Sequence, residues 1–158
     1  MIDISDITTL RARIGEEIVV GDWLEISQAR IDQFADATGD HQWIHVDAGR
    51  AATESPFKST IAHGFLTLSL LSTLVRGAIR FAGLRMAINY GLNKVRFVSP
   101  VPSGARVRAR ITPAAVNDVT GGGVQVTWQV TVEREHGEKP CLVAEWIVRY
   151  FPDGGPEG

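Results

Sequence analysis

The chain has 158 residues, a formal net charge of −2 and 44% apolar residues. This length predicts one domain with a sizeable core, and the slight acidic excess argues against nucleic acid as a main partner. The single cysteine, Cys141, excludes an internal disulfide, and no apolar run approaches the roughly 18 residues of a membrane helix. Because residues 1–6 lack a signal-peptide pattern, we expect a cytoplasmic protein whose thiol is buried and inert.

The first predicted helix lies between Ser27 and Gly39. Ser27 suits the N-cap position, and Ile26 and Ile31 are placed to form a hydrophobic staple across it. Gly39 is typical of the left-handed residue that ends a helix.

Residues 40–63 are predicted to be mostly irregular, with a short helix near 49–54. A second helix is expected from Gly64 to about Phe81. Its leucines do not keep to one face, and it is too short and too rich in hydroxyl groups to cross a bilayer. A helix that is apolar on nearly all sides belongs inside the protein, so we expect it at the centre of the core.

The second half of the sequence alternates between apolar and polar residues, a pattern typical of antiparallel strands with one buried face. In the clearest run, four valines and Trp128 share one face. The predicted strands span 93–97, 106–111, 124–132 and 142–151, with a turn at Gly121-Gly122-Gly123. We predict an α+β fold, a sheet wrapped around the buried helix, as one domain over residues 1–151 with a loose tail at 152–158. A dimer would cover the edges of such a sheet.

The densest polar cluster spans residues 38–47. Within it, His41 and His45 stand four residues apart, like the histidines of a zinc-binding helix. Gln42, however, occupies the position where that motif carries its general base, and Gly39 predicts that the preceding helix has already ended. We therefore expect no metal site.

Asp40 and His45 in this cluster also suit acid–base chemistry. A carboxylate and an imidazole that converge on one water can polarise it and carry its proton away near neutral pH. The alternative is structural: Asp40 caps a turn and His45 packs against Trp43. The residues by themselves favour the structural interpretation slightly and leave the other open.

A second cluster, Ile61-Ala62-His63-Gly64-Phe65, opens the buried helix. A helix N-terminus presents unpaired N–H groups, and Gly64 has no side chain to keep a ligand oxygen from its backbone. Such an arrangement would form an oxyanion site. Equally, Gly64 could serve only to allow a tight turn into the helix.

Taken together, the two clusters resemble the MaoC-like hydratase/dehydratase family. Its members have the hot-dog fold and include (R)-specific enoyl-CoA hydratases and nodulation protein N-like proteins. Asp40, four further residues and His45, followed after a gap by His63-Gly64, match the family pattern. The segment 90–97 resembles the strand after the central helix, and the resemblance covers about residues 15–150.

The resemblance implies reversible addition of water to a trans-2-enoyl-CoA, which gives an (R)-3-hydroxyacyl-CoA. Asp40 and His45 would hold the water and exchange protons with it, and the N–H of Gly64 would stabilise the enolate-like thioester oxygen. His63 and Ser72 would help to bind the substrate. No cofactor and no metal would be needed, because hydration changes no oxidation state overall.

Some positions of the pattern are less definite. The run His41-Gln42-Trp43-Ile44 stands where many family members carry Asn-Pro-Leu, which leaves the preferred acyl length open. Ser69 lies close to Ser72 and competes with it for the family's helix serine.

The phosphates of coenzyme A need cations, and Lys94 and Arg96 share one strand face, as do the arginines of 106–111. The resemblance makes Lys94 and Arg96 candidate phosphate contacts, with a solvated strand face as the alternative. The expected assembly is a homodimer.

Three other functions share parts of this pattern. A 3-hydroxyacyl dehydratase of fatty-acid synthesis would use the same residues on an acyl-carrier-protein thioester. A hot-dog thioesterase normally needs an acid on or near the central helix, and residues 64–81 contain none. A non-catalytic acyl-binding module would have no need of the pair Asp40 and His45.

Overall fold

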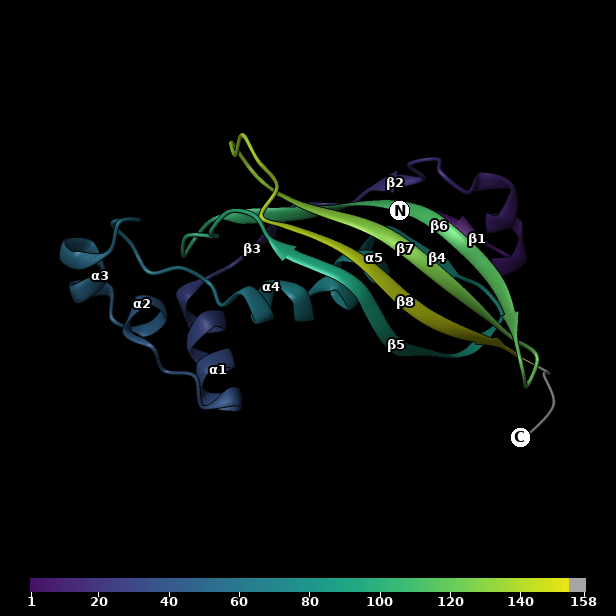
Figure 1. The fold of residues 1–158 in the computed structure, drawn as a ribbon, viewed down its shortest axis with the longest axis horizontal. Helices are drawn as coiled ribbons and strands as arrows, with labels where there is room; N and C mark the ends of the chain where they lie inside the picture. The colour runs from purple at the N-terminus through teal and green to yellow at the C-terminus, as the bar shows by residue number, and fades with distance from the viewer. Residues whose placement is uncertain (154–158) are drawn as a thin grey trace.

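The structure, a computed structural model, describes residues 1–153 (Figure 1). Its helical segments are η1 (Ile7–Arg13), a 3-10 helix, and α1 (Gln28–Thr38), α2 (Trp43–Val46), α3 (Ala48–Glu54), α4 (Gly64–Ser69) and α5 (Leu71–Ala78). Its strands are β1 (Ile2–Ile4), β2 (Val19–Val20), β3 (Leu24–Glu25), β4 (Ile79–Phe81), β5 (Leu84–Phe97), β6 (Arg106–Val119), β7 (Gly123–Arg134) and β8 (Leu142–Pro152).

The long strands form one antiparallel sheet in the order β2-β6-β7-β8-β5, and β3 also pairs with β6. A separate parallel pair joins β1 to β4. The sheet arches over α4 and α5, while α1, α2 and α3 lie together beyond one end of it (Figure 1). The predicted α+β fold, with a sheet wrapped around a central helix, is confirmed.

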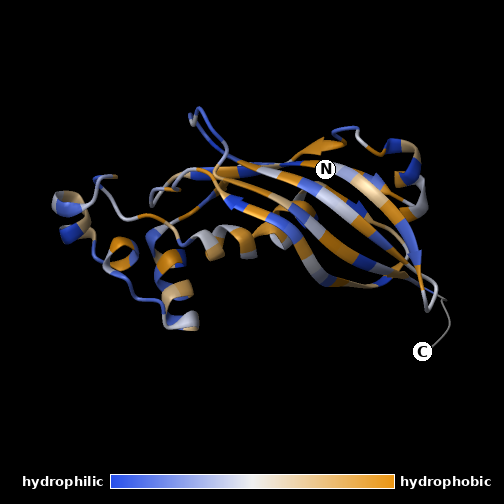
Figure 2. Cartoon of the chain, viewed as in Figure 1, coloured by the Kyte–Doolittle hydropathy of each residue, from blue (hydrophilic) through white to orange (hydrophobic). Residues whose placement is uncertain are grey.

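The face of the sheet toward α4 and α5, which we call the inner face, is apolar. In β7 the side chains of Val126, Trp128 and Val130 are buried and alternate with more exposed residues, as the bands of Figure 2 show. They belong to one core cluster with Leu74 of α5. Trp128 Nε1 donates to the hydroxyl of Tyr150 at 2.9 Å, so this large buried side chain keeps its polar atom satisfied. The period-two alternation is confirmed.

The central helix is shorter than predicted. It is divided at Leu70, whose backbone stays close to helical, with φ −74° and ψ −9°. The second part ends at Ala78 and not near Phe81, because the β-branched Ile79 begins β4 and pairs with Ile2 of β1. The prediction of a buried apolar helix is right, but its end was placed too late.

The predicted caps of α1 are confirmed. The N–H of Arg30 donates to the Ser27 hydroxyl, and Gly39 adopts φ 77° while its N–H donates to the carbonyl of Ala35. This left-handed residue is where a glycine is needed, because a side chain would be strained there. The chain therefore leaves α1 sharply at Gly39 and enters the loop that carries Asp40.

The other predicted segments are present with different lengths. The strands predicted at 93–97 and 106–111 lie inside the longer β5 and β6, and the short helix near 49–54 is α3. The turn at 121–123 joins β6 to β7, with positive φ at two of its glycines. The strands β1 to β3, together with η1 and α2, were not predicted. They are too short for a periodic pattern to show.

Cys141 is buried, and its thiol donates to the carbonyl of Val132 at 3.2 Å. Burial raises the pKa of this thiol to about 11, so it stays protonated near neutral pH. The expected inert thiol is confirmed.

Two residues that the sequence placed in the tail, Pro152 and Asp153, lie within the described structure. Pro152 closes β8, and the N–H of Asp153 donates to the carbonyl of Gly83 at 2.8 Å. The rest of the predicted tail, 154–158, lies outside the described residues. Within residues 1–153, no helix has the length and apolar character that crossing a membrane requires.

Candidate active site

Three short segments bring Asp40, His45 and His63 together. Asp40 follows the end of α1, His45 lies in α2, and His63 caps the N-terminus of α4. One polar atom from each of the three side chains lies within 4.8 Å of the other two. Asp40 is exposed, whereas both histidines are buried. We call these three residues the histidine cluster.

The tautomer of His45 follows from its hydrogen bond. Its Nδ1 lies 2.7 Å from the carbonyl oxygen of Ile61. Because a carbonyl can only accept, Nδ1 carries the proton and Nε2 keeps its lone pair. Burial lowers the pKa of His45, and the nearby His63 lowers it further. The side chain is therefore a neutral imidazole near pH 7, with one ring nitrogen able to accept a proton.

Gln28 holds the backbone of His45 in place, a role that the sequence did not suggest. Its Nε2 donates to the carbonyl oxygen of His45 at 2.8 Å. Its Oε1 accepts from the hydroxyl of the buried Thr60 at 2.5 Å. Gln28 thus ties the start of α1 to the loop before α4. The same Nε2 also donates to Oδ1 of Asp32, one helical turn away. No local pattern could have identified the role of Gln28 at the site, since its partners there lie 17 and 32 residues away.

His63 contacts both other members of the cluster. Its Nε2 donates to the backbone carbonyl oxygen of Asp40 at 2.9 Å, and its ring stacks on His45 with the centroids 3.7 Å apart. The ring of Phe34 lies tilted against the His63 ring, with the two centroids 5.0 Å apart. His63 is only 2% exposed, and its Nδ1 has no hydrogen-bond partner. The substrate-binding role that the resemblance implied for His63 stays a prediction, and the structure shows its contacts with Asp40 and His45.

His41 does not join the cluster. Its Nε2 lies 2.9 Å from Oδ1 of Asp36, and this carboxylate raises the pKa of the exposed imidazole. The zinc-like pair of His41 and His45 is therefore not formed. Among residues 1–153, the group whose side chains could together offer donor atoms to an ion is the histidine cluster, with one atom from each residue.

The structural alternatives for Asp40 and His45 are met only weakly. The N–H of Gln42 approaches Oδ1 of Asp40 at 3.4 Å, a long contact for a turn cap. Trp43 lies under the guanidinium of Arg50, whose carbon is 4.3 Å from the ring centroid, while His45 stacks on His63. The side chains of Asp40 and His45 thus keep polar atoms free for other partners.

Gly64 is the first residue of α4, so its N–H has no partner within the helix. A β-carbon at this position would lie 3.0 Å from the ring of Phe97, which is closer than ordinary contacts allow. Phe65, 67% exposed, packs edge-on against the same ring. A side chain at position 64 would therefore need the ring of Phe97 to shift.

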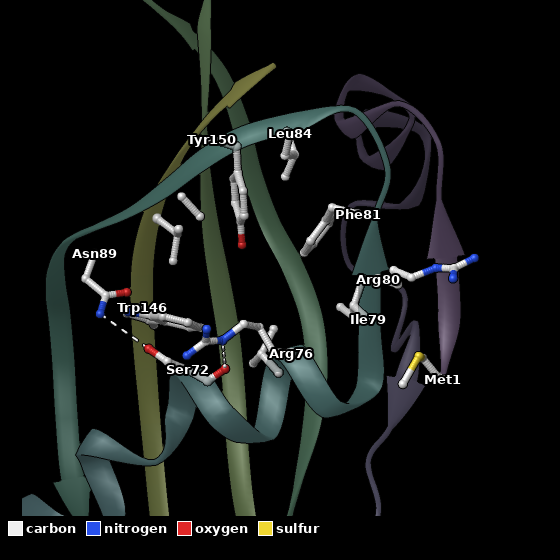
Figure 3. Close-up of a pocket in the computed structure, with 13 residues that line it drawn as sticks. Met1, Ser72, Arg76, Ile79, Arg80, Phe81, Leu84, Asn89, Trp146 and Tyr150 are labelled. Atoms are coloured by element: carbon white, nitrogen blue, oxygen red, sulfur yellow. Dashed lines mark hydrogen bonds between the residues drawn. The ribbon is translucent and has the colours of Figure 1, made fainter. Parts of the chain in front are cut away.

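Ser72 lies apart from the histidine cluster, in α5. Its hydroxyl accepts from Nδ2 of Asn89 at 3.3 Å, and both line a cavity beside β5 (Figure 3). Ser69, the competing serine, donates to the carbonyl of Phe65 in its own helix. Ser72 thus lines the larger of two adjoining cavities and Ser69 only the smaller one, and the assignment of Ser72 as the family's helix serine stays a prediction.

Lys94 and Arg96 lie on the outer face of the sheet. They pair with Glu145 and Val143, which alternate with the core residues of β8. Lys94 Nζ is 3.0 Å from Oε1 of Glu145, and Arg96 donates to the carbonyl of Val95 at 2.7 Å. Both side chains therefore lie on the face of the sheet opposite to the core.

The arginines of β6 lie on the same outer face. Each has a glutamate partner: Arg106 with Glu135, Arg108 with Glu133 and Arg110 with Glu17. Paired charges on a strand face are what a solvated surface shows. The interpretation of these arginines as a solvated face fits this geometry.

The histidine cluster has the parts needed to hold one reactive water. One polar atom of each side chain lies within 4.8 Å of the others, which is within the reach of two hydrogen bonds of about 2.8 Å to one water. On one side stands a solvent-exposed carboxylate and on the other the bare Nε2 of His45. Such a pair can take a proton from the water as its oxygen attacks an electrophile.

Comparison with known proteins agrees with this architecture. Residues 9–135 match a family model described as MaoC like domain. The chain is 54% identical over 144 residues to 3-hydroxyacyl-thioester dehydratase Z of Mycobacterium tuberculosis (strain ATCC 25618 / H37Rv), a match that covers 91% of this chain and 95% of that protein. It is 46% identical over 155 residues to nodulation protein N of Rhizobium leguminosarum bv. viciae, with 93% of each chain covered.

The solved structures show the same fold. The R-hydratase PhaJ1 from Pseudomonas aeruginosa superimposes with a TM-score of 0.63 and 26% identity, covering 89% of this chain and 86% of that one. The likeness shows the hot-dog fold that the resemblance implied. With the fold, the spacing of the histidine cluster and the family model in agreement, this chain belongs to the MaoC-like family.

Proposed function

We propose that the protein is a hydro-lyase that catalyses the reversible hydration of trans-2-enoyl-CoA to (R)-3-hydroxyacyl-CoA. The observation that carries the proposal is the histidine cluster, in which the carboxylate of Asp40 and the bare Nε2 of His45 can bind one water. The relatives support it, since one is named a dehydratase of 3-hydroxyacyl thioesters and another an R-hydratase.

In the hydration direction, Asp40 and His45 hold the water against C3 of the enoyl group. One of the two accepts a proton as the water oxygen attacks C3, and a proton is delivered to C2. The neutral His45 suits this step because its lowered pKa leaves Nε2 unprotonated near pH 7. His63 keeps both partners in place through its bond to the Asp40 carbonyl and its stacking on His45.

As water adds, negative charge develops on the thioester oxygen. The N–H of Gly64, which has no partner within α4, would donate to that oxygen as the charge develops. Protons and water are the only groups exchanged, so the residues of the chain suffice and no redox cofactor takes part. The acyl carrier is coenzyme A in this proposal, with an acyl-carrier protein as the competing carrier.

A homodimer is part of the proposal. β5 forms one edge of the sheet, and large apolar side chains along it are exposed: Met86, Ile88, Tyr90 and Leu92. An exposed apolar edge strand is a surface that pairing with a second copy would cover.

The proposal is tested by incubating the purified protein with trans-2-enoyl-CoA esters of several lengths and following the loss of the enoyl-thioester absorbance. Chiral analysis should identify the (R)-3-hydroxyacyl product. Parallel assays with enoyl and 3-hydroxyacyl esters of an acyl-carrier protein compare the two carriers. An (S) product, or release of free thiol in place of hydration, would overturn the proposed reaction.

A further inference from the structure

A cavity of about 580 Å³ lies between α5, β4 and the inner faces of β5 and β8 (Figure 3). Its volume is within the range of about 300–1,000 Å³ typical of small-molecule sites. Most of its wall is apolar: Val75, Ile79, Phe81, Leu84, Ala87, Trp146 and Val148. The mechanism proposed above does not use this wall.

Arg76 brings a positive charge to this apolar cavity. Its guanidinium lies next to Trp146 and Ser72 in Figure 3, and its Nε donates to the carbonyl oxygen of Ser72 at 3.2 Å. That bond orients the guanidinium but engages only one of its donors. Among residues 1–153, Arg76 has no acidic partner, and no aspartate or glutamate lines the cavity.

The second arginine at the cavity, Arg80, differs from Arg76 in this respect. Its Nε lies 2.6 Å from Oδ1 of Asp3, so a carboxylate of the chain already balances its charge. The two arginines therefore line the same cavity, Arg80 with a counter-charge and Arg76 without one. This difference makes Arg80 a matched control for Arg76.

A second donor is directed into the cavity. The hydroxyl of Tyr150 points toward its interior in Figure 3, and its oxygen accepts from Nε1 of Trp128 at 2.9 Å. Burial raises the pKa of Tyr150, so its hydroxyl keeps a hydrogen that it can donate. Arg76 and Tyr150 thus both offer hydrogen atoms to an acceptor in the cavity.

We propose that this cavity binds an aliphatic chain that ends in a carboxylate, with the chain against Ile79, Phe81 and Val148 and the carboxylate at Arg76. The apolar wall favours burial of the chain, and the free donors of the guanidinium suit a carboxylate in a bidentate geometry. Such a group could be the far end of a substrate acyl chain or a free fatty acid. A smaller cavity along Leu68 and Leu71 adjoins this one at Ser72 and leads toward α4.

The proposal is tested by titrating the full chain with octanoate and with 1-octanol in a calorimeter. In the unaltered protein octanoate should bind more tightly than 1-octanol. Arg76→Gln should weaken octanoate binding by about tenfold, the usual scale for loss of a charged hydrogen-bond partner, and leave octanol binding unchanged. Arg80→Gln should change neither. Absence of octanoate binding, or equal weakening by both variants, would overturn the proposal.

The two sources of the carboxylate are separated by inhibition of enoyl-CoA hydration. Competitive inhibition by octanoate that is relieved in Arg76→Gln assigns the cavity to the far end of the substrate acyl chain. Binding without competition assigns it to a free fatty acid. Because binding is measured without turnover, failure of the proposed hydratase reaction would leave this test intact.

Discussion

The histidine cluster and the outer face of the sheet both carry many ionisable side chains, but they handle charge in opposite ways. On the outer face, Arg108 is paired with Glu133, and Lys94 with Glu145. In the cluster, the two imidazoles donate to backbone carbonyls, and the other ring nitrogen of each has no hydrogen-bond partner among residues 1–153. The comparison teaches that charge density alone does not identify a reactive site. A reactive site is identified by polar atoms that have no partner and lie beside buried side chains.

The physical basis of the difference is the choice of partner. A carboxylate that pairs with an arginine uses the lone pairs that a proton would need, and the pair lies in water, where it stabilises little. A backbone carbonyl instead fixes the tautomer of an imidazole without neutralising a charge. Variants of the two regions should therefore differ in what they change, as the following predictions state from the largest effect to the smallest.

The largest effect is expected for Asp40→Asn. An amide cannot accept the proton of the bound water, so kcat/KM for enoyl-CoA hydration should fall by about 10²–10⁴-fold, the usual range for acid–base groups. The fold should persist, because the His63 bond is made to the backbone of residue 40 and not to its side chain. Asp36→Asn, which alters the carboxylate paired with His41, is the control and should keep full activity. Full activity in Asp40→Asn would contradict the proposed role.

The pH dependence should report on His45. Since burial lowers its pKa below the ordinary 6.5, the active neutral form should persist below pH 6.5, and kcat/KM should decline only at more acidic pH. His45→Gln should have little activity and no such acid limb. An acid limb at or above pH 6.5 in the unaltered protein would contradict this assignment.

The pH dependence of the free energy of unfolding should also reflect the lowered pKa of His45. Below pH 6.5 the unfolded chain binds a proton at His45 that the folded chain resists, so the free energy of unfolding should decrease as the pH falls from 6.5 through the lowered pKa. Urea unfolding at a series of pH values measures this slope. The slope should be shallower in His45→Gln, and an unchanged slope would show that other groups cause it.

A smaller loss of activity is expected for Gly64→Ala. The added β-carbon would meet the ring of Phe97 at 3.0 Å and displace the N–H without removing it. The loss should therefore be less than the roughly 10²–10³-fold loss that removal of an oxyanion donor causes. Gly77→Ala is the control, because a β-carbon at Gly77 meets nothing within 4 Å. It should leave kcat/KM unchanged and raise the free energy of unfolding by about 0.5–1 kcal/mol.

The smallest effects belong to the outer face. Lys94→Gln and Arg96→Gln should each change the free energy of unfolding by less than about 1 kcal/mol, as exposed charges do. The KM for enoyl-CoA should also stay unchanged, because both side chains lie on the outer face of the sheet, opposite to the face that packs on α4 and α5. A rise in KM for the coenzyme A ester but not for the shorter pantetheine ester would instead support their role as phosphate contacts.

The strands show how far a periodic pattern reaches. β7 alternates without interruption over the predicted run, so both its place and its buried face could be predicted. β5 was predicted only at its last five residues, 93–97. Its register shifts near Asn89 and Leu92 and its exposed apolar residues break the alternation. An edge strand has a neighbour on one side alone, and its pattern is correspondingly weaker.

The sequence by itself determined the alternating strands, the caps of α1, the apolar central helix and the two clusters whose spacing resembles the MaoC-like family. These follow from local periodicity and from residue types at short spacing. The tertiary structure alone decided which polar atoms are free. The carbonyl that orients His45 belongs to Ile61, 16 residues away, and the one that binds His63 belongs to Asp40, 23 residues away. A tautomer and a free lone pair depend on such distant partners, which no local pattern contains.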